Sequence, residues 1–405
     1  MNYIKNLVNS YRGLPKEIYI LFVANIINAA GSFIVPLLTL ILTQKIGLSS
    51  EVSGIYVSIF GIMYLPAGII GGKLTDLFGR KKVIIIFQSL ACLIYILCGI
   101  LKPSLITVYL IMISGLFAGF VYPAISSMTA DITTPENRNA SYSFTYMGWN
   151  LGFAIGPLIG GLLFKNHLSI LFLGDAATTL IALLLIGLFI KETKGISNNV
   201  IDESRGLEQS EEGSIITVLR KRKTLLLVCV AVFGYTLGFA QWGFLLPIEL
   251  SKIYGLLGAK HYGFLTSFNG FVVIIMTPIL TKYLSKTKNL KNILISGIFY
   301  TIGIGTLGFF SSMSFFFVAI FIFTLGEIIL TTNINTYIAN NTPESHRGRM
   351  LGIIPILTGA GYVIGPPLIG ELLKITSYAV IWRILSLIIL VSTVLVLYIL
   401  KRKNQ

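Results

Sequence analysis

The chain has 405 residues, of which 55% are apolar and only 12% are charged. A soluble domain carries about 25% charged residues, so this composition excludes an ordinary water-soluble protein. The formal net charge is +15, but the basic residues stand in short clusters beside apolar segments and form no aromatic or basic stripe, which argues against a nucleic-acid partner.

Apolar segments of about 20 residues, the length that crosses a bilayer, follow one another along the chain. The first is too long for the core of a signal peptide and no small-residue cleavage site precedes it, so we expect it to be retained. The sequence predicts an all-α membrane protein with twelve transmembrane helices. The expected spans are 18–43, 51–72, 82–101, 104–129, 140–164, 168–190, 224–249, 260–284, 291–311, 313–338, 348–373 and 377–400.

The basic residues also predict the orientation of the chain. Of the 31 Lys and Arg residues, 24 fall on the side of both predicted termini and 6 on the opposite side, while Arg383 lies inside the last span. Lys and Arg are enriched on the cytoplasmic side of membrane proteins. We therefore expect a multi-pass protein of the plasma membrane with both termini in the cytoplasm.

A polar segment divides the chain into two related halves. The predicted domains are an N-terminal six-helix bundle (1–190), a cytoplasmic linker (191–223) and a C-terminal six-helix bundle (224–405). Several small residues recur at a constant spacing of 209 positions, which indicates a duplicated unit. Gly152, Gly156, Pro157 and Gly161 of the first half match Gly361, Gly365, Pro366 and Gly370 of the second.

The loop between the second and third spans reads G-x-L-x-D-x-x-G-R-K-K over residues 72–82. Gly72 allows two helices to approach closely, and Gly79 permits a tight turn. The Asp76 carboxylate can lie at the positive N-terminal end of a facing helix, and Arg80 can pair with Asp131 at the end of the fourth span. A loop that only fixed topology would need the positive charge but not the acid between two spaced glycines.

This loop resembles the signature loop between helices 2 and 3 of the major facilitator superfamily of secondary transporters. One position departs from the family pattern, because a basic residue is usual where Leu77 stands here. The resemblance covers essentially the whole chain and implies two pseudo-symmetric six-helix bundles. It also implies a conformational latch, with Asp76 facing helix 11 near Gly348. The latch residues are Gly72, Asp76, Gly79, Arg80 and Asp131.

The fifth span carries a second motif. Glycines four residues apart, from Gly148 to Gly160, form one small-residue face, and Pro157 leaves a carbonyl unpaired and kinks the helix. The segment resembles the G-x-x-x-G-P-x-x-G-G motif of drug:proton antiporters. Generic helix packing is the alternative, and some uptake carriers also have Gly-Pro in this span. The motif residues are Gly152, Gly156, Pro157, Gly160 and Gly161.

Two acidic residues within spans are candidates for proton coupling. Glu327 is the only Asp, Glu, Lys, Arg or His between Lys291 and Glu344, near the middle of the tenth span. A charged carboxylate there costs at least about 2.5–3.5 kcal/mol, so it is expected to exist protonated for part of the transport cycle. The alternative is a protonated Glu that only bonds a neighbouring helix. Asp175, closer to the outer surface, is a second candidate.

Other polar side chains at suitable depth suit an amphipathic substrate cavity, in which aromatic rings supply area and amides supply hydrogen bonds. Each of them alone could equally serve packing. Two further acids, Glu249 and Glu371, are expected at the outer rim in contact with solvent. The cavity candidates are Asn25, Asn28, Tyr146, Asn150, Gln241, Trp242, Asn269 and Asn333.

Signals for enzymatic chemistry are missing from the sequence. There is no G-x-x-x-x-G-K-[ST] nucleotide loop, no His-x-x-x-His pair and no metal-ligand spacing, so we expect no enzyme activity, no metal and no cofactor. The three cysteines lie within apolar segments and read as small buried hydrophobes.

Together these features predict a monomeric secondary transporter that exports amphipathic drugs or related organic compounds by alternating access, with protons and the lipid bilayer as its other partners. No basic side chain lies mid-span except Arg383, which favours a neutral or cationic substrate. Two alternatives stay open: a proton-coupled uptake carrier for a small neutral metabolite, and a membrane sensor or scaffold that does not transport.

Overall fold

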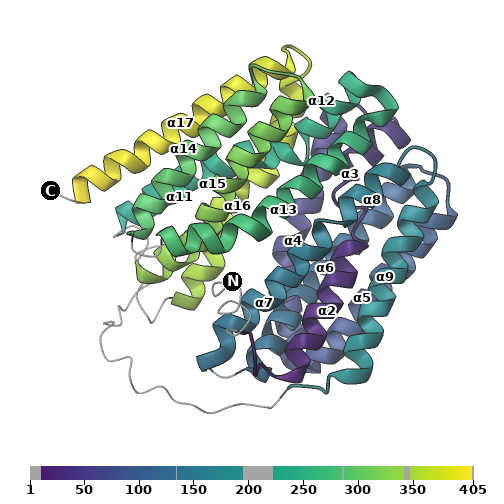
Figure 1. Ribbon diagram of the computed structural model, residues 1–405. Helices are drawn as coiled ribbons and strands as arrows, with labels where there is room; N and C mark the ends of the chain where they lie inside the picture. The colour runs from purple at the N-terminus through teal and green to yellow at the C-terminus, as the bar shows by residue number, and fades with distance from the viewer. Residues whose placement is uncertain (1–10, 134, 195–221, 285–286, 342–346, 404–405) are drawn as a thin grey trace. The chain divides into compact units, whose positions relative to one another are not determined.

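The computed structural model describes residues 11–133, 135–194, 222–284, 287–341 and 347–403 (Figure 1). Within these ranges the regular structure is helical and no strand occurs. The chain divides into two compact units. The first unit comprises 1–48, 59–200 and 250–270, and the second comprises 49–58, 201–249 and 271–405.

The helices of the N-terminal half follow the predicted spans closely, except where a span is broken. They are α2 (Lys16–Ala30), α3 (Leu38–Leu40) with a π-helical turn (Ile41–Lys45), α4 (Ser50–Phe78), α5 (Arg80–Ile100), α6 (Leu105–Ile132), α7 (Pro135–Phe153), α8 (Gly156–Leu163) and α9 (Leu168–Phe189).

The helices of the C-terminal half are of similar length. They are α11 (Lys223–Phe239) with a 3-10 turn (Ala240–Trp242), α12 (Leu245–Tyr254) with a second 3-10 turn (Gly255–Leu257), α13 (Gly258–Leu284), α14 (Asn289–Leu307), α15 (Met313–Asn340), α16 (Arg347–Leu372) and α17 (Tyr378–Lys403).

The same packing pattern occurs in each unit. In the first, α2 packs on α7 and α9, while α5 packs on α6 and α9. In the second, α11 packs on α16 and α17, while α14 packs on α15 and α17, which Figure 1 shows side by side in green and yellow. The matching partners confirm the duplication that the residue spacing predicts.

Buried apolar side chains of α2, α5, α6 and α9 form a core in the first unit. Ile18 and Leu21 of α2 pack with Ile84 of α5 and with Leu183 and Ile186 of α9. Each of these helices also exposes large apolar side chains, such as Val23 and Leu184. Apolar residues on the outer faces are expected where lipid, rather than water, surrounds the bundle.

Three predicted spans are not continuous helices. An interruption was expected only in the fifth, where Pro157 predicts a kink, and those in the first and seventh were not predicted. The first stops at Ala30 and resumes at Leu38, the fifth is interrupted between Phe153 and Gly156, and the seventh changes to a 3-10 turn after Phe239. Proline accounts for the first two breaks, because it has no N–H to donate to the carbonyl four residues earlier.

Eight segments of the described ranges are long and apolar enough to cross a membrane, and one of them, 223–281, runs through α11, α12 and α13. They cover nine of the predicted spans. The first and fifth spans fall outside them because each is broken into shorter helices, and α16 falls outside them as well.

Candidate functional site

The turn between α4 and α5 depends on one glycine. Gly79 has φ of 97°, a left-handed conformation that side chains other than glycine rarely adopt. A Cβ atom at this position would also lie 2.6 Å from Oε2 of Glu192. The tight turn predicted for Gly79 is confirmed, and it brings the start of α5 against the segment that follows α9.

An ion pair joins this turn to the end of α6. The Nε atom of Arg80 donates to Oδ2 of Asp131 at 2.8 Å, and both side chains are mostly buried, at 16% and 20% exposure. Thr193 donates its hydroxyl to the same carboxylate oxygen at 3.0 Å. The predicted pairing of Arg80 with Asp131 is therefore present, with Thr193 as an additional donor.

A second carboxylate, which sequence reasoning missed, holds the same turn. Oε1 of Glu192 accepts backbone N–H groups of Arg80 at 2.8 Å, Thr193 at 3.0 Å and Lys194 at 3.1 Å. Burial raises the pKa of the Glu192 carboxyl, but these N–H donors lower it by more, so its pKa lies below the ordinary value. We call Arg80, Asp131, Glu192 and Thr193 the signature clamp.

Two lysines next to the signature clamp donate hydrogen bonds to backbone carbonyl groups. The Nζ atom of Lys81 donates to the carbonyl of Gly187 at 2.6 Å, and that of Lys194 donates to the carbonyl of Leu77 at 2.8 Å. The lysines thus cap carbonyl groups at helix ends, where cations are favoured by the helix dipole. Their role is structural as well as topological.

The close approach predicted at Gly72 lies one residue earlier. A Cβ at Gly71 would stand 2.6 Å from backbone atoms of Phe120 on α6, whereas a Cβ at Gly72 would meet no described atom within 4 Å. The register of α4 turns Gly71, not Gly72, toward α6. The side chain of Asp76, the remaining latch residue, lies outside the part of the chain that the structure describes.

The small-residue face of the fifth span packs on α2. A Cβ at Gly152 would lie 2.3 Å from the carbonyl oxygen of Ile26, and a Cβ at Gly148 or Gly156 would lie 2.8 Å from a backbone oxygen of α2. Gly160 is less constrained, since its nearest neighbour is a side-chain atom of Leu37 at 3.1 Å. The motif therefore brings two backbones together, as its spacing predicts.

The first turns of α13 also meet this motif within the first unit. A Cβ at Gly161 would lie 2.5 Å from the carbonyl oxygen of Ala259, and a Cβ at Gly263 would lie 2.4 Å from that of Pro157. The break before Gly156 ends α7, and Pro157 stands in the first turn of α8. The motif is thus a packing junction with two partners.

The carboxylate of Asp175 lies at the break in the first span. Asp175 is 5% exposed, and its Oδ2 atom accepts the N–H groups of Phe33 at 3.2 Å and Ile34 at 3.4 Å. Gly31 opens the break, and a Cβ there would collide with the side chain of Thr178, one turn from Asp175 on α9. Asp175 therefore satisfies the Ile34 N–H that the broken helix leaves unpaired, and it shares the Phe33 N–H with the carbonyl of Gly31, which accepts it at 2.9 Å.

Glu327 stands midway along α15 and is half-buried. It interacts electrostatically with the hydroxyl groups of Tyr300 on α14 and Tyr362 on α16. One helical turn before it on the same face, Phe323 stands 5.1 Å from the ring of Trp242 and 5.8 Å from that of Phe239.

The rings near Glu327 form one group. Phe239 lies 5.8 Å from Tyr300 and 6.1 Å from Tyr362, between centroids, in edge-on geometry. We call Phe239, Trp242, Tyr300, Phe323 and Tyr362 the aromatic cluster. Two of its members, Tyr300 and Tyr362, are the residues that interact with Glu327, so the cluster places large apolar surface beside a single carboxylate.

The polar candidates of the first unit have protein partners. Asn25 donates to the carbonyl of Thr145 at 3.2 Å, and Thr179 donates to Oδ1 of Asn28 at 3.1 Å. Both amides line a small cavity of about 20 Å³, large enough for one water molecule. The others are Asn150, which donates to the carbonyl of Tyr146 at 2.9 Å, and Asn269, which is buried.

The polar candidates of the second unit are similarly engaged. Gln241 is fully buried at the break of the seventh span and donates to the carbonyl of Leu237 at 3.2 Å. Asn333 accepts a hydrogen bond from Asn292 at 2.8 Å, and Trp242 belongs to the aromatic cluster. These bonds explain each residue by packing, and a substrate role stays a prediction.

Comparison with known proteins decides the family. The family model described as Major Facilitator Superfamily matches residues 20–354 and 291–405. The chain belongs to the Major Facilitator Superfamily. The sequence resemblance stated above is thereby confirmed, and so is the expectation of a transporter rather than an enzyme.

Several members of the superfamily resemble this chain along most of its length. A "Na(+), Li(+), K(+)/H(+) antiporter" of Planococcus maritimus is 24% identical over 366 residues, covering 84% of this chain and 85% of that protein. "Multidrug resistance protein 2" of Bacillus subtilis (strain 168) is 23% identical over 374 residues, covering 90% of each.

A solved structure of the peptide transporter POT in complex with sulfate superposes with a TM-score of 0.80. It is 18% identical in sequence and covers 97% of this chain and 95% of the other. At this identity the similarity supports the Major Facilitator fold of the chain and says nothing of its substrate.

One acid of this superfamily member lies where the sequence did not predict it. Glu249 was expected in solvent at the rim, but it is 5% exposed and accepts a hydrogen bond from Nε1 of Trp382 at 2.7 Å. That prediction was wrong, because α17 covers the residue. Glu371 is exposed as expected and pairs with Lys374 at 2.9 Å.

Arg383, the lone basic residue within a span, is bound at the end of α14. Its Nε atom donates to the carbonyl of Gly308 at 2.8 Å, and its guanidinium lies 4.7 Å from the ring centre of Phe309. The residues described include no group of three or more His, Cys, Asp or Glu that could hold a metal ion.

Proposed function

We propose that this protein is a proton-coupled exporter of amphipathic, neutral or cationic organic compounds in the plasma membrane. The observation that carries the proposal is the position of Glu327, halfway along α15, half-buried and beside the aromatic cluster. A carboxylate at mid-bilayer is expensive to keep and marks a functional site by default.

The surroundings of Glu327 favour an organic cation over an anion. Aromatic faces attract cations within about 6 Å and supply apolar contact to a hydrophobic body. The basic residue that could have served an anion, Arg383, is instead held by the carbonyl of Gly308. An ionised Glu327 would add a counter-charge for a positively charged substrate.

The proposed cycle uses the charge of Glu327 as the switch. Proton binding removes the charge and lowers the cost of enclosing the side chain, which shifts the equilibrium between the two open states. Two six-helix bundles, 1–190 and 224–405, joined by 191–223, then rock around the midplane site. A proton moved inward across 100 mV supplies about 2.3 kcal/mol.

In this cycle the latch biases the protein toward one open state. The signature clamp fixes the turn at Gly79 and so orients the end of α4, from which Asp76 is proposed to reach the eleventh predicted span, α16, near Gly348. Asp175 stays a second proposed protonation site, although its two backbone donors already give it a structural role.

The named relatives support export but leave two kinds of cargo. Relatives named for multidrug resistance favour organic compounds. The relative named as an alkali cation/proton antiporter favours exchange of Na⁺, Li⁺ or K⁺ instead. Hard metal cations prefer oxygen ligands, whereas Glu327 lies beside a cluster of aromatic rings, so we place the organic substrate first.

Efflux from energised inverted membrane vesicles tests the proposal, with ethidium or Hoechst dye as the substrate. The wild type is expected to move dye into the vesicles until an uncoupler is added, and Glu327→Gln is expected to abolish this uphill transport. Glu371→Gln, a matched change at an exposed carboxylate, is expected to leave it intact.

The same vesicles separate the competing functions. Proton release on addition of Na⁺ or K⁺ without dye transport would favour the metal cation antiporter. Dye transport that ignores both the uncoupler and Glu327→Gln would reject proton coupling through this residue. Uphill accumulation of a nutrient in right-side-out vesicles would favour an uptake carrier.

A further inference from the structure

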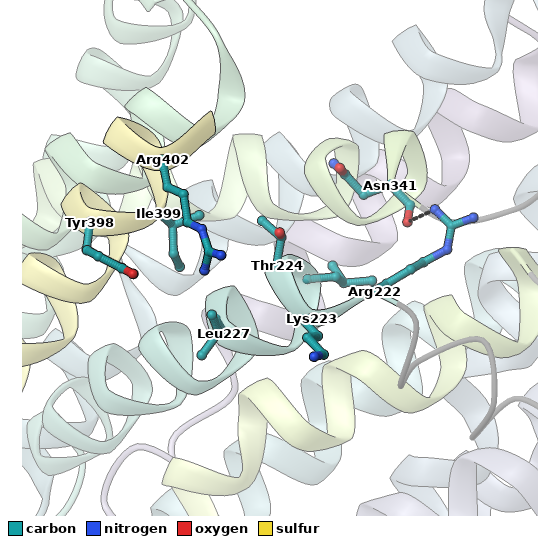
Figure 2. A pocket seen from close by; sticks show the side chains of 9 residues that line it. Arg222, Lys223, Thr224, Leu227, Asn341, Tyr398, Ile399 and Arg402 are labelled. Carbon is teal, nitrogen blue, oxygen red and sulfur yellow. Dashed lines mark hydrogen bonds between the residues drawn. The ribbon is translucent and has the colours of Figure 1, made fainter. Parts of the chain in front are cut away.

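The second unit contains a pocket of about 510 Å³ where α11 begins and α17 ends (Figure 2). Its polar lining comes from three parts of the chain: Arg222, Lys223 and Thr224 at the start of α11, Tyr398 and Arg402 at the end of α17, and Asn341 just after α15. The volume lies within the roughly 300–1,000 Å³ of small-ligand sites.

Positive charge dominates this pocket. Arg222, Lys223 and Arg402 bring three cationic side chains to its wall, and its described lining includes no Asp or Glu. Figure 2 shows the Arg402 guanidinium extending between Tyr398 and Thr224. Like charges gathered around one space repel each other, so an anion bound among them relieves that repulsion.

One of the cations in this pocket is fixed by a hydrogen bond to the chain. The Nη1 atom of Arg222 donates to the carbonyl of Asn341 at 2.9 Å, which holds this guanidinium at one side (Figure 2). The Thr224 side chain and the Tyr398 hydroxyl add neutral donors between the cations. Cations with interspersed hydroxyl donors suit the several oxygens of a phosphate group.

The depth of the pocket points to the membrane as the source of the anion. The apolar segments that could cross the bilayer begin at Lys223 and end at Arg402 on this side, so the cations stand at headgroup level. The apolar side chains of Leu227 and Ile399 complete the wall. Tyr398, 55% exposed, is the type of residue enriched at the membrane interface.

We propose that this pocket binds the phosphate headgroup of an anionic phospholipid, with the acyl chains running along the apolar surface near Leu227 and Ile399. Basic pockets between transmembrane helices bind such headgroups. The charge bias of the sequence places the site in the cytoplasmic leaflet, which carries the anionic lipid. The site is independent of the coupling role proposed for Glu327.

Native mass spectrometry of the detergent-purified full chain tests the proposal by titration with phosphatidylglycerol and, in parallel, with phosphatidylcholine. The wild type is expected to prefer phosphatidylglycerol. Replacing one cation is expected to weaken its binding about fivefold, the change that corresponds to roughly 1 kcal/mol per Lys or Arg near an anionic surface. The double variant Lys223→Gln/Arg402→Gln is expected to weaken it roughly 25-fold.

Two matched variants guard against a general effect of charge. Lys401→Gln removes an exposed cation on the same helix that does not line the pocket, so it is expected to bind like the wild type. Arg402→Lys keeps the charge and is expected to retain most of the binding. Equal loss in Lys401→Gln, or no loss in the double variant, would overturn the proposal.

A third arm separates a lipid headgroup from a soluble phosphate. Millimolar inorganic phosphate, compared with chloride at equal ionic strength, is expected to displace little phosphatidylglycerol, because the acyl chains add contacts that free phosphate lacks. Complete displacement would assign the pocket to a soluble anion and reject the lipid. Should the double variant fold poorly, the single Arg402→Gln change at an exposed side chain gives the same comparison.

Discussion

Replacing Asp175 distinguishes a carboxylate that holds a broken helix from one that carries a proton. Oδ2 of Asp175 accepts two backbone N–H groups, from Phe33 and Ile34, at a site that is 5% exposed. Asp175→Ala removes the acceptor and leaves the buried Ile34 N–H without a partner, whereas the Phe33 N–H keeps its bond to the carbonyl of Gly31 at 2.9 Å. Asp175→Asn removes the charge but keeps a side-chain oxygen that can accept the same donors.

The expected cost follows from this geometry. A buried donor without a partner costs about 1–3 kcal/mol, and the long contact of 3.4 Å from Ile34 places this loss in the lower half of that range. The Phe33 N–H adds little, because it keeps the carbonyl of Gly31 as an acceptor. Alanine favours the helix by up to about 0.7 kcal/mol, so Asp175→Ala should cost about 1–2 kcal/mol in total. Asp175→Asn should cost under about 1 kcal/mol.

Thermal unfolding of the purified variants, followed by tryptophan fluorescence, measures this difference. At about 2–4 °C per kcal/mol, Asp175→Ala should lower the apparent Tm by about 2–8 °C and Asp175→Asn by less than about 4 °C. Equal and large losses in both variants would refute the reasoning. Dye efflux by the folded Asp175→Asn protein then shows whether the charge also matters for coupling.

Three further predictions concern packing and the signature clamp. Gly152→Ala should destabilise the protein by about 1–3 kcal/mol, because its Cβ would lie 2.3 Å from a backbone oxygen of α2. Gly68→Ala is the control and should not destabilise the protein, because Gly68 has open space around it; equal Tm values for the two variants would contradict the prediction. Because the pKa of Glu192 is lowered, its hydrogen bonds should persist above about pH 4.3, the ordinary Glu value, and be lost as the pH falls through the lowered pKa. Amide hydrogen exchange at the start of α5, corrected for intrinsic rates, should show protection that disappears only in acid. Loss of protection near neutral pH would contradict the prediction. Trp382→Phe should lower the Tm, because it leaves the buried Glu249 carboxylate without its hydrogen-bond donor. Adding Glu249→Gln to this variant should lower the Tm little further, and additive losses would contradict the pairing of the two side chains.

Local sequence signals predicted the helices and the duplication well. Uninterrupted apolar length located α5, α9, α14 and α17, because a bilayer imposes that length on each helix independently of its neighbours. The turn at Gly79 and the pair of Arg80 with Asp131 were also predictable, since glycine and charge spacing encode them directly.

Features that depend on tertiary contact escaped prediction. Pro36 is visible in the sequence, but the contact that stabilises the break after Ala30 comes from Asp175, far away in the chain. Glu192 contacts a turn that is more than a hundred residues earlier in the chain. Glu249 is buried because Trp382 covers it, which no local pattern around Glu249 reveals.

Gly72 shows how a motif can be assigned correctly at the level of the family and still be misread by one position. The pattern fixes the residue types, but the rotation of α4 about its axis decides which glycine faces α6, and the glycine that does so is Gly71. A one-residue shift rotates a side chain by about 100° around the helix axis.

Proteoliposomes containing purified protein test the central claim, that the charge of Glu327 couples transport to protons. Exchange of labelled for unlabelled dye requires no net proton movement, whereas accumulation driven by a pH gradient does. Glu327→Gln is expected to retain exchange and to lose gradient-driven accumulation. Accumulation by Glu327→Gln that still collapses when the pH gradient is removed would contradict the claim, because protons would then be coupled elsewhere.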